Sequence, residues 1–179
     1  MRLKLGDIAP AFELPDLHGN LVRLSDFAGR RLLISFHRYA ACPLCNLHIH
    51  ELSQASTELK SHGLEIVAIF MSGPQRVADQ YESREVPFPI LADPDRKAYG
   101  PYGVESSIPG MLASFVHPRA MKAFFSGFMP GKIDADTTTL PADFLLNSEH
   151  QIVDTWYSSN ITQHMPLDRI RRFALNHHV

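Results

Sequence analysis

The chain has 179 residues, 45% of them hydrophobic, which suffices for one ordinary domain with a sizeable core. Its 17 basic and 19 acidic residues give a formal net charge of -2 without a long run of either sign, so the charge pattern does not favour nucleic acid or a membrane surface as a partner. No apolar stretch has the length of a signal peptide or a membrane span, and we expect a cytoplasmic protein.

The N-terminal half of the chain alternates between strand and helix patterns. Two short extended segments flank a turn rich in Asp, Gly and Asn and predict a hairpin, and two later apolar runs are typical of strands covered on both faces. The expected strands are 11–14, 21–24, 31–36, 64–71 and 88–91, and the expected helices are 43–62 and 75–83. Such alternation indicates an α/β layer with parallel crossovers.

The C-terminal part predicts two more strands, at 144–146 and 152–157, and a last helix from about residue 166. Between about residues 105 and 139 the alternation stops, and an aromatic-rich segment broken by prolines predicts a helical insertion. This insertion could add to the core, cover an active site or form a dimer surface, so a homodimer is possible. Residues 1–179 are otherwise expected to form a single domain.

The two cysteines of the chain, Cys42 and Cys45, follow a predicted buried strand and open a predicted helix. At a helix start, unpaired N–H groups and the helix dipole favour the thiolate, the reactive form of cysteine. Pro43 suits the first helical position, where its missing N–H costs nothing. Cys42 is therefore the expected nucleophile, and Cys45, one turn further, the expected resolving thiol.

The same segment also holds His48 and His50, so metal binding is an alternative. At about 100° per residue His50 faces away from His48, which disfavours a four-ligand site and hence a metal-carrying protein. We expect both histidines on the helix surface, with His48 close enough to influence Cys45. A non-catalytic redox-sensing or binding module is a further alternative.

Several motifs around the cysteine pair resemble the alkyl hydroperoxide reductase C / thiol-specific antioxidant (AhpC/TSA) family of the thioredoxin-like superfamily. They occur in the family's order at residues 6–14, 19–27, 88–95, 102–104 and 140–146. The resemblance covers most of the chain. It implies a three-layer α/β thioredoxin-like fold with an N-terminal β-hairpin and a helical insertion before the strand that begins near Pro141.

The sequence departs from the family pattern at two peroxide-activating positions. Tyr39 replaces a threonine three residues before the peroxidatic cysteine, and Pro141 replaces an arginine. Pro141 instead resembles the cis-proline that thioredoxins place beside their cysteine pair, and a trans proline that opens an edge of a strand is the alternative. Arg38 matches a peroxiredoxin-like subgroup with an aromatic-x-Arg before Cys-Pro-x-Cys, and it either stabilises the Cys42 thiolate or forms a salt bridge at the strand end.

Together these features predict a thiol-dependent oxidoreductase that reduces disulfides or hydroperoxides. The catalytic candidates are Cys42, Cys45, Pro141, Arg38 and Tyr39. A small thiol or a thioredoxin- or glutaredoxin-type protein would supply the reducing equivalents. No metal or cofactor is expected, because no glycine-rich phosphate loop occurs. With both peroxide-activating positions altered, we expect a disulfide to be reduced at least as efficiently as hydrogen peroxide.

Overall fold

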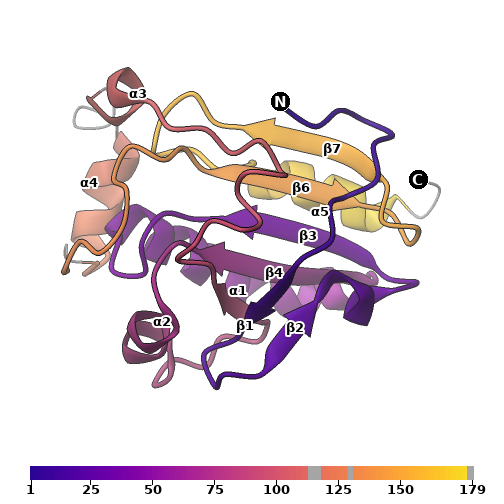
Figure 1. Ribbon diagram of the computed structural model, residues 1–179, viewed down its shortest axis with the longest axis horizontal. Coiled ribbons are helices and arrows are strands. Elements are labelled where there is room, and N and C mark those ends of the chain that lie inside the picture. The colour runs from indigo at the N-terminus through magenta and orange to yellow at the C-terminus, as the bar shows by residue number, and fades with distance from the viewer. Residues whose placement is uncertain (113–117, 129–130, 177–179) are drawn as a thin grey trace.

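The computed structural model, described here for residues 1–112, 118–128 and 131–176, is built around a five-stranded mixed sheet in the order β5-β4-β3-β6-β7 (Figure 1). The strands are β3 (Arg31–Phe36), β4 (Leu64–Phe70), β5 (Ile90–Ala92), β6 (Ala142–Leu146) and β7 (Ile152–Tyr157). β3, β4 and β5 are parallel, whereas β6 runs antiparallel to β3 and β7 antiparallel to β6. All five were predicted, with bounds that differ by at most two residues.

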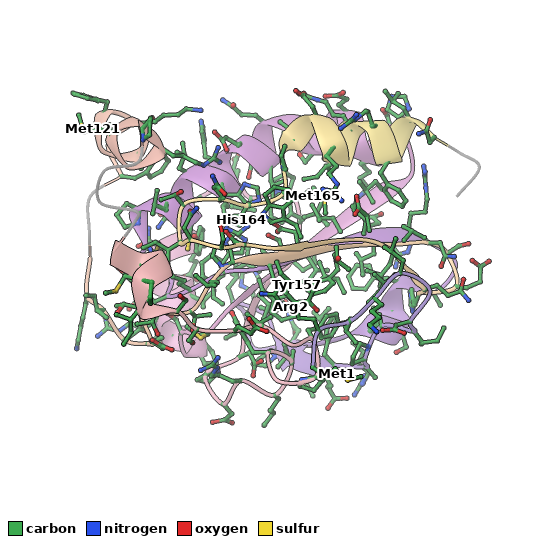
Figure 2. All side chains as sticks on the ribbon, turned by 90° about the horizontal axis from the view of Figure 1, so that it is seen from above. Met1, Arg2, Met121, Tyr157, His164 and Met165 are labelled. Atoms are coloured by element: carbon green, nitrogen blue, oxygen red, sulfur yellow. The ribbon has the colours of Figure 1, made fainter. Side chains whose placement is uncertain are left out.

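One face of the sheet is covered by helices. Figure 2 shows α1 (Pro43–Ser61) and α5 (Leu167–Leu175) on the same side of the strands, and α2 (Pro74–Tyr81) contributes buried side chains to the same hydrophobic cluster. Three helices were expected here. The stripe of apolar residues at helical spacing explains their position, because it gives each helix one buried face.

The opposite face is covered by segments that are mostly not helical. They include the antiparallel hairpin of β1 (Glu13–Pro15) and β2 (Leu21–Arg23), the 3-10 helix η1 (Leu24–Phe27) and the turns near Tyr99. Both faces of the central strands are therefore buried, which confirms the thioredoxin-like α/β architecture with its N-terminal hairpin. β2 ends one residue earlier than expected because Asp26 accepts a hydrogen bond from the Arg23 amide and starts η1 there.

The predicted insertion contains two short helices, α3 (Ile108–Leu112) and α4 (Pro118–Phe125), before β6. α4 packs beside α1, and Glu51 of α1 accepts hydrogen bonds from Arg119 and Lys122 of α4. The parts of the predicted insertion at 113–117 and 129–130 lie outside the described residues. Among the helices that the structure describes, none is long and apolar enough to cross a membrane.

Candidate active site

The cysteine pair lies at the junction between β3 and α1. β3 ends at Phe36, a short loop follows, and Cys42 is the N-cap of α1 with Pro43 as its first residue. The Sγ atom of Cys42 accepts a hydrogen bond from the backbone N–H of Cys45 at 3.4 Å. This is one of the helix-start N–H groups without an intrahelical partner, so the predicted helix-start position of Cys42 is confirmed.

Arg38 lies directly against the nucleophile candidate. Its Nη2 donates a hydrogen bond to Sγ of Cys42 at 2.8 Å, and its Nη1 donates to the carbonyl oxygen of Thr137 at 3.0 Å. The Arg38 residue is only 4% exposed. The sequence left two roles open for Arg38. This geometry favours contact with Cys42 over a salt bridge at the strand end.

The two thiols have opposite electrostatic environments. Burial opposes ionisation of Cys42, but the hydrogen bond from the Cys45 side chain and the positive charge of Arg38 outweigh it and lower the Cys42 pKa to about 6. For Cys45, burial and the adjacent Cys42 raise the pKa well above its ordinary value. At neutral pH the site therefore holds a thiolate at Cys42 and a thiol at Cys45.

Both cysteines are buried, at 0% and 1% exposure, and both are free thiols. Part of their cover comes from the insertion. The Gly131 N–H donates to the carbonyl oxygen of Ala41 at 3.3 Å, and Asp134 accepts a hydrogen bond at 2.8 Å from Ser72, whose hydroxyl in turn accepts from the Ala40 amide. The segment that follows α4 therefore covers the active-site loop, one of the roles that the sequence left open.

Tyr39 is also buried, at 6% exposure, and the guanidinium of Arg38 lies 5.4 Å from the centre of its ring. Burial and the negative charge at Cys42 raise the pKa of Tyr39 to about 12, despite the opposing effect of Arg38. The hydroxyl therefore stays protonated at neutral pH and is available as a hydrogen-bond donor.

The expectation that Pro141 is a cis-proline is wrong, because all peptide bonds in the described part of the chain are trans. Pro141 is buried and directly precedes β6, and its carbonyl oxygen accepts the Ser158 N–H at 3.0 Å. A trans proline fits the first position of a strand, where the missing N–H removes no ladder hydrogen bond. The alternative that the sequence also allowed, a proline that opens the strand, is the one observed.

The expectation that His48 lies on the helix surface is also wrong, since it is 3% exposed. His48 follows Cys45 by one turn, so it shares the α1 face that packs on the sheet. There its ring stacks on that of His164, with the centroids 3.9 Å apart. His50 is exposed, as the helix geometry predicted, and does not share this environment with His48.

Sequence reasoning missed Asn46, which is buried directly behind the cysteine loop. Its Nδ2 donates to the carbonyl oxygens of Ala40 and Cys42 at 2.9 and 2.8 Å, while its Oδ1 accepts from Gln80 and Arg84. These bonds tie the loop to α1 and connect it to α2. An asparagine inside a helix pattern carries no signal of such a role, because Gln80 and Arg84, which hold its Oδ1, come from a distant segment.

A thiolate and a thiol at the first turn of a helix, after the central strand of a thioredoxin-like sheet, define a thiol-dependent oxidoreductase. A family model described as "AhpC/TSA family" matches residues 5–155 of the chain. The protein therefore belongs to the AhpC/TSA family, as the sequence motifs indicated.

Relatives and solved structures agree with this assignment. The chain is 31% identical over 156 residues to peroxiredoxin Bcp of Escherichia coli, a match covering 86% of this chain and 95% of that protein. It is 38% identical over 105 residues to a putative peroxiredoxin of Mycobacterium tuberculosis, covering 57% and 67% of the two chains. The crystal structure of peroxidoxin BcpB from Mycobacterium tuberculosis superposes with a TM-score of 0.72 at 19% identity, covering 97% of both chains, and shows the same fold.

Proposed function

We propose that the protein is a thiol peroxidase that reduces hydroperoxides through Cys42 and Cys45. The observation that carries this proposal is the 2.8 Å hydrogen bond from Arg38 to Sγ of Cys42. It supplies a positive charge beside the nucleophile although the arginine usual for the family is replaced by Pro141. The peroxiredoxin names of the relatives support the same substrate class.

In the first step the Cys42 thiolate attacks one oxygen of the peroxide. The S–O bond forms as the O–O bond breaks, so sulfur is oxidised by two electrons and the peroxide is reduced to an alcohol or water. The leaving oxygen takes up the proton that Cys42 released on ionising. Arg38 and the Tyr39 hydroxyl are the groups that would orient the peroxide and stabilise the departing oxygen.

In the second step Cys45 resolves the sulfenic acid on Cys42. Its sulfur attacks the Cys42 sulfur, water leaves, and an intramolecular disulfide forms. The pair lies within one helical turn, which brings the two sulfurs within reach of each other. Two electrons from an external dithiol, or from two small thiols, then restore both cysteines, and we propose a thioredoxin- or glutaredoxin-type protein or a small thiol for this step.

Two features favour a peroxide over a disulfide as the oxidant and so revise the expectation from the sequence. Cys42 is 0% exposed, so a polypeptide disulfide would need a larger opening of the site than a peroxide molecule would. The trans bond at Pro141 also removes the reason for expecting a thioredoxin-like docking edge beside the pair. A peroxidase with a buried thiolate is the function that these observations support best.

Stopped-flow oxidation of the fully reduced protein tests the proposal. Hydrogen peroxide and a small organic hydroperoxide are compared with oxidised glutathione and an oxidised thioredoxin, each followed by loss of free thiol. We expect oxidation by the peroxides to be faster by at least about tenfold, and Cys42→Ser to abolish it. Faster oxidation by a disulfide would assign the protein to thiol–disulfide exchange instead.

A further inference from the structure

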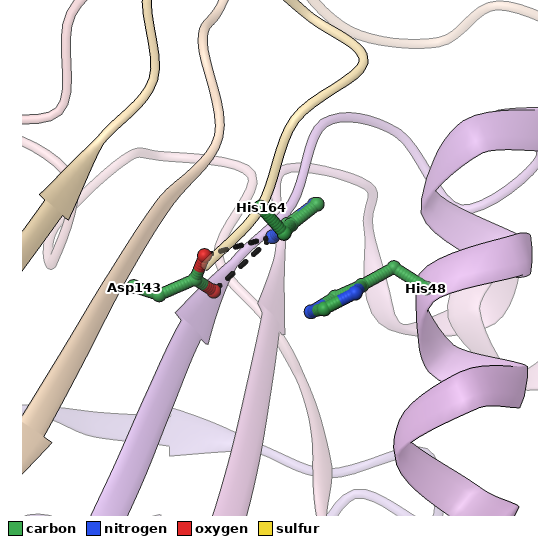
Figure 3. A group of neighbouring side chains, drawn as sticks. All are labelled: His48, Asp143 and His164. Carbon is green, nitrogen blue, oxygen red and sulfur yellow. Dashed lines mark hydrogen bonds and ion pairs between the residues drawn. The ribbon is translucent and has the colours of Figure 1, made fainter. Parts of the chain in front are cut away.

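A second cluster of chemically active side chains lies behind the cysteine pair, between α1 and the sheet. It consists of His48 from α1, Asp143 from β6 and His164 from the loop that precedes α5, all of them buried (Figure 3). One possible ligand atom from each of the three lies within 4.8 Å of the others. We propose that these residues form a binding site for a divalent transition-metal ion of the Zn²⁺ type, separate from the thiols.

The distance between His164 and Asp143 matches metal coordination. The Nδ1 atom of His164 lies 3.1 and 3.2 Å from the two carboxylate oxygens of Asp143. Two ligands that each bind Zn²⁺ at about 2.0–2.2 Å in a tetrahedral arrangement are separated by about this distance. An ion would replace the proton that this pair shares in the structure, and the His164 proton would then reside on Nε2.

The third ligand is a buried nitrogen without a hydrogen-bond partner among the described residues. That atom is Nε2 of His48. Buried polar atoms in native proteins are almost always paired, so such atoms point to a missing water or ion. Nδ1 of the same ring faces Oε2 of Glu51 at 3.9 Å, which leaves Nε2 as the nitrogen that can offer a lone pair to a metal.

The surroundings of Asp143 support the same conclusion. This carboxylate is 0% exposed and lies within hydrogen-bond distance of the His164 ring. Its oxygens accept hydrogen bonds from Ser35 Oγ at 2.5 Å and from the Met165 N–H at 2.6 Å. Both are neutral donors, which would fix the carboxylate in place as outer-shell partners do, and its remaining contact is the imidazole of His164.

A cavity beside the site also gives room for an ion and for water molecules. His48 and His164 line a cavity of about 610 Å³ between α1 and the segment leading into α5, with Glu51 and Trp156 in its wall. Water from this cavity could complete the coordination of the ion. The rings of His48 and His164 are stacked, with 10° between their planes, so the His48 ring must rotate about its Cβ–Cγ bond to direct Nε2 at an ion beside His164.

Zinc titration of the chelator-stripped full-length chain tests the proposal. Because thiolates also bind Zn²⁺, the titration uses the Cys42→Ser/Cys45→Ser double variant. Calorimetry monitors the titration, and metal analysis after desalting measures the bound Zn²⁺. We expect one Zn²⁺ per chain, and a loss of affinity of at least about 100-fold in His164→Gln and in His48→Gln made in that background. His50→Gln, on the exposed side of the same helix, should bind as the parent does.

Co²⁺ provides a second readout that does not depend on the stability of the histidine variants. In the wild-type reduced chain we expect a d–d spectrum from nitrogen and oxygen ligands, unchanged when both cysteines are replaced. Loss of binding in the double-cysteine variant would assign the ion to the thiols. Equal affinity in the His48, His164 and His50 variants would mean surface binding, and either result would overturn the proposal.

Discussion

Arg38 and Cys42 lie four residues apart on the same loop, and the guanidinium of the first donates a hydrogen bond to the sulfur of the second over 2.8 Å. The positive charge and the proposed nucleophile therefore come from one short segment between β3 and α1. The family pattern places an arginine instead at the position of Pro141, at the start of β6. This chain supplies the same charge from a different element of the fold.

The first prediction concerns this contact. The rate of Cys42 alkylation by iodoacetamide should rise as the pH increases through about 6 and level off above it, because the thiolate is the reactive form. In Arg38→Gln the midpoint should move to higher pH, and oxidation by hydrogen peroxide at pH 7 should slow by about 10²–10³-fold. Arg23→Gln, in an exposed ion pair of the hairpin, is the control. An unchanged midpoint in Arg38→Gln would show that Arg38 does not stabilise the Cys42 thiolate.

The second prediction separates the roles of the two thiols. Cys45→Ser should react with one equivalent of peroxide and then stop, because the sulfenic acid on Cys42 has no neighbouring thiol to condense with. Mass spectrometry after trapping with dimedone should find the adduct on Cys42. The wild-type protein should instead lose both thiols and remain a monomeric disulfide on a non-reducing gel. An adduct on Cys45 of Cys42→Ser at a comparable rate would reverse the assignment.

The third prediction concerns the Tyr39 hydroxyl, whose pKa of about 12 keeps it protonated at neutral pH. If it donates a hydrogen bond to the peroxide, Tyr39→Phe should slow oxidation by peroxide by about tenfold, the effect of about 1.4 kcal/mol in the barrier. Alkylation by iodoacetamide should keep its rate and its pH midpoint, because this reagent needs no such donor. Equal slowing of both reactions would indicate a change in packing rather than a lost donor.

The fourth prediction tests the cover over the active site. A Cβ atom added at Gly131 would lie 2.6 Å from the Cβ of Ala41, next to Cys42. Gly131→Ala should therefore displace the covering segment and increase the rate at which iodoacetamide labels Cys42, by a few-fold. Gly73→Ala is the matched control, since its added Cβ meets nothing within 4 Å. Slower labelling in Gly131→Ala would show that this contact does not limit access.

The fifth prediction concerns Glu51, which links α1 to α4. Burial opposes its ionisation, but His48, Lys122 and Arg119 lower its pKa from 4.5 to about 2. Because the folded-state pKa is the lower one, this stabilisation is present above about pH 4.5 and is lost as the pH falls towards 2. Glu51→Gln should lower the free energy of unfolding at pH 7 by about 1 kcal/mol after solvent screening, and by less at pH 3.

Urea unfolding at the two pH values measures the effect of Glu51→Gln. Glu82→Gln, which changes an exposed carboxylate at the end of α2, controls for the loss of one negative charge. A destabilisation by Glu51→Gln that is the same at pH 3 and pH 7 would contradict the assignment, because the wild-type side chain would then contribute nothing through its charge.

Local sequence patterns were enough to predict the elements of the fold and the position of the cysteine pair. Residues 31–36 and the helix from Pro43 follow local rules, namely a run of apolar side chains and a proline at the first helical turn. The placement of Cys42 at the helix start therefore needed no knowledge of the tertiary structure. The same is true of the family, whose motifs are short and contiguous.

The distant residues that surround that pair could be identified only from the three-dimensional packing. Thr137 and Gly131 reach the active-site loop from the insertion, while Asp143 and His164 meet His48 between α1 and the sheet. Such contacts depend on how the layers stack, and no local pattern encodes the pairing of two segments about a hundred residues apart. Burial of His48 is the plainest case. The helical period predicts that His48 and Cys45 share one face of α1. His48 is buried because that face packs against polar side chains of β6 and of the loop before α5.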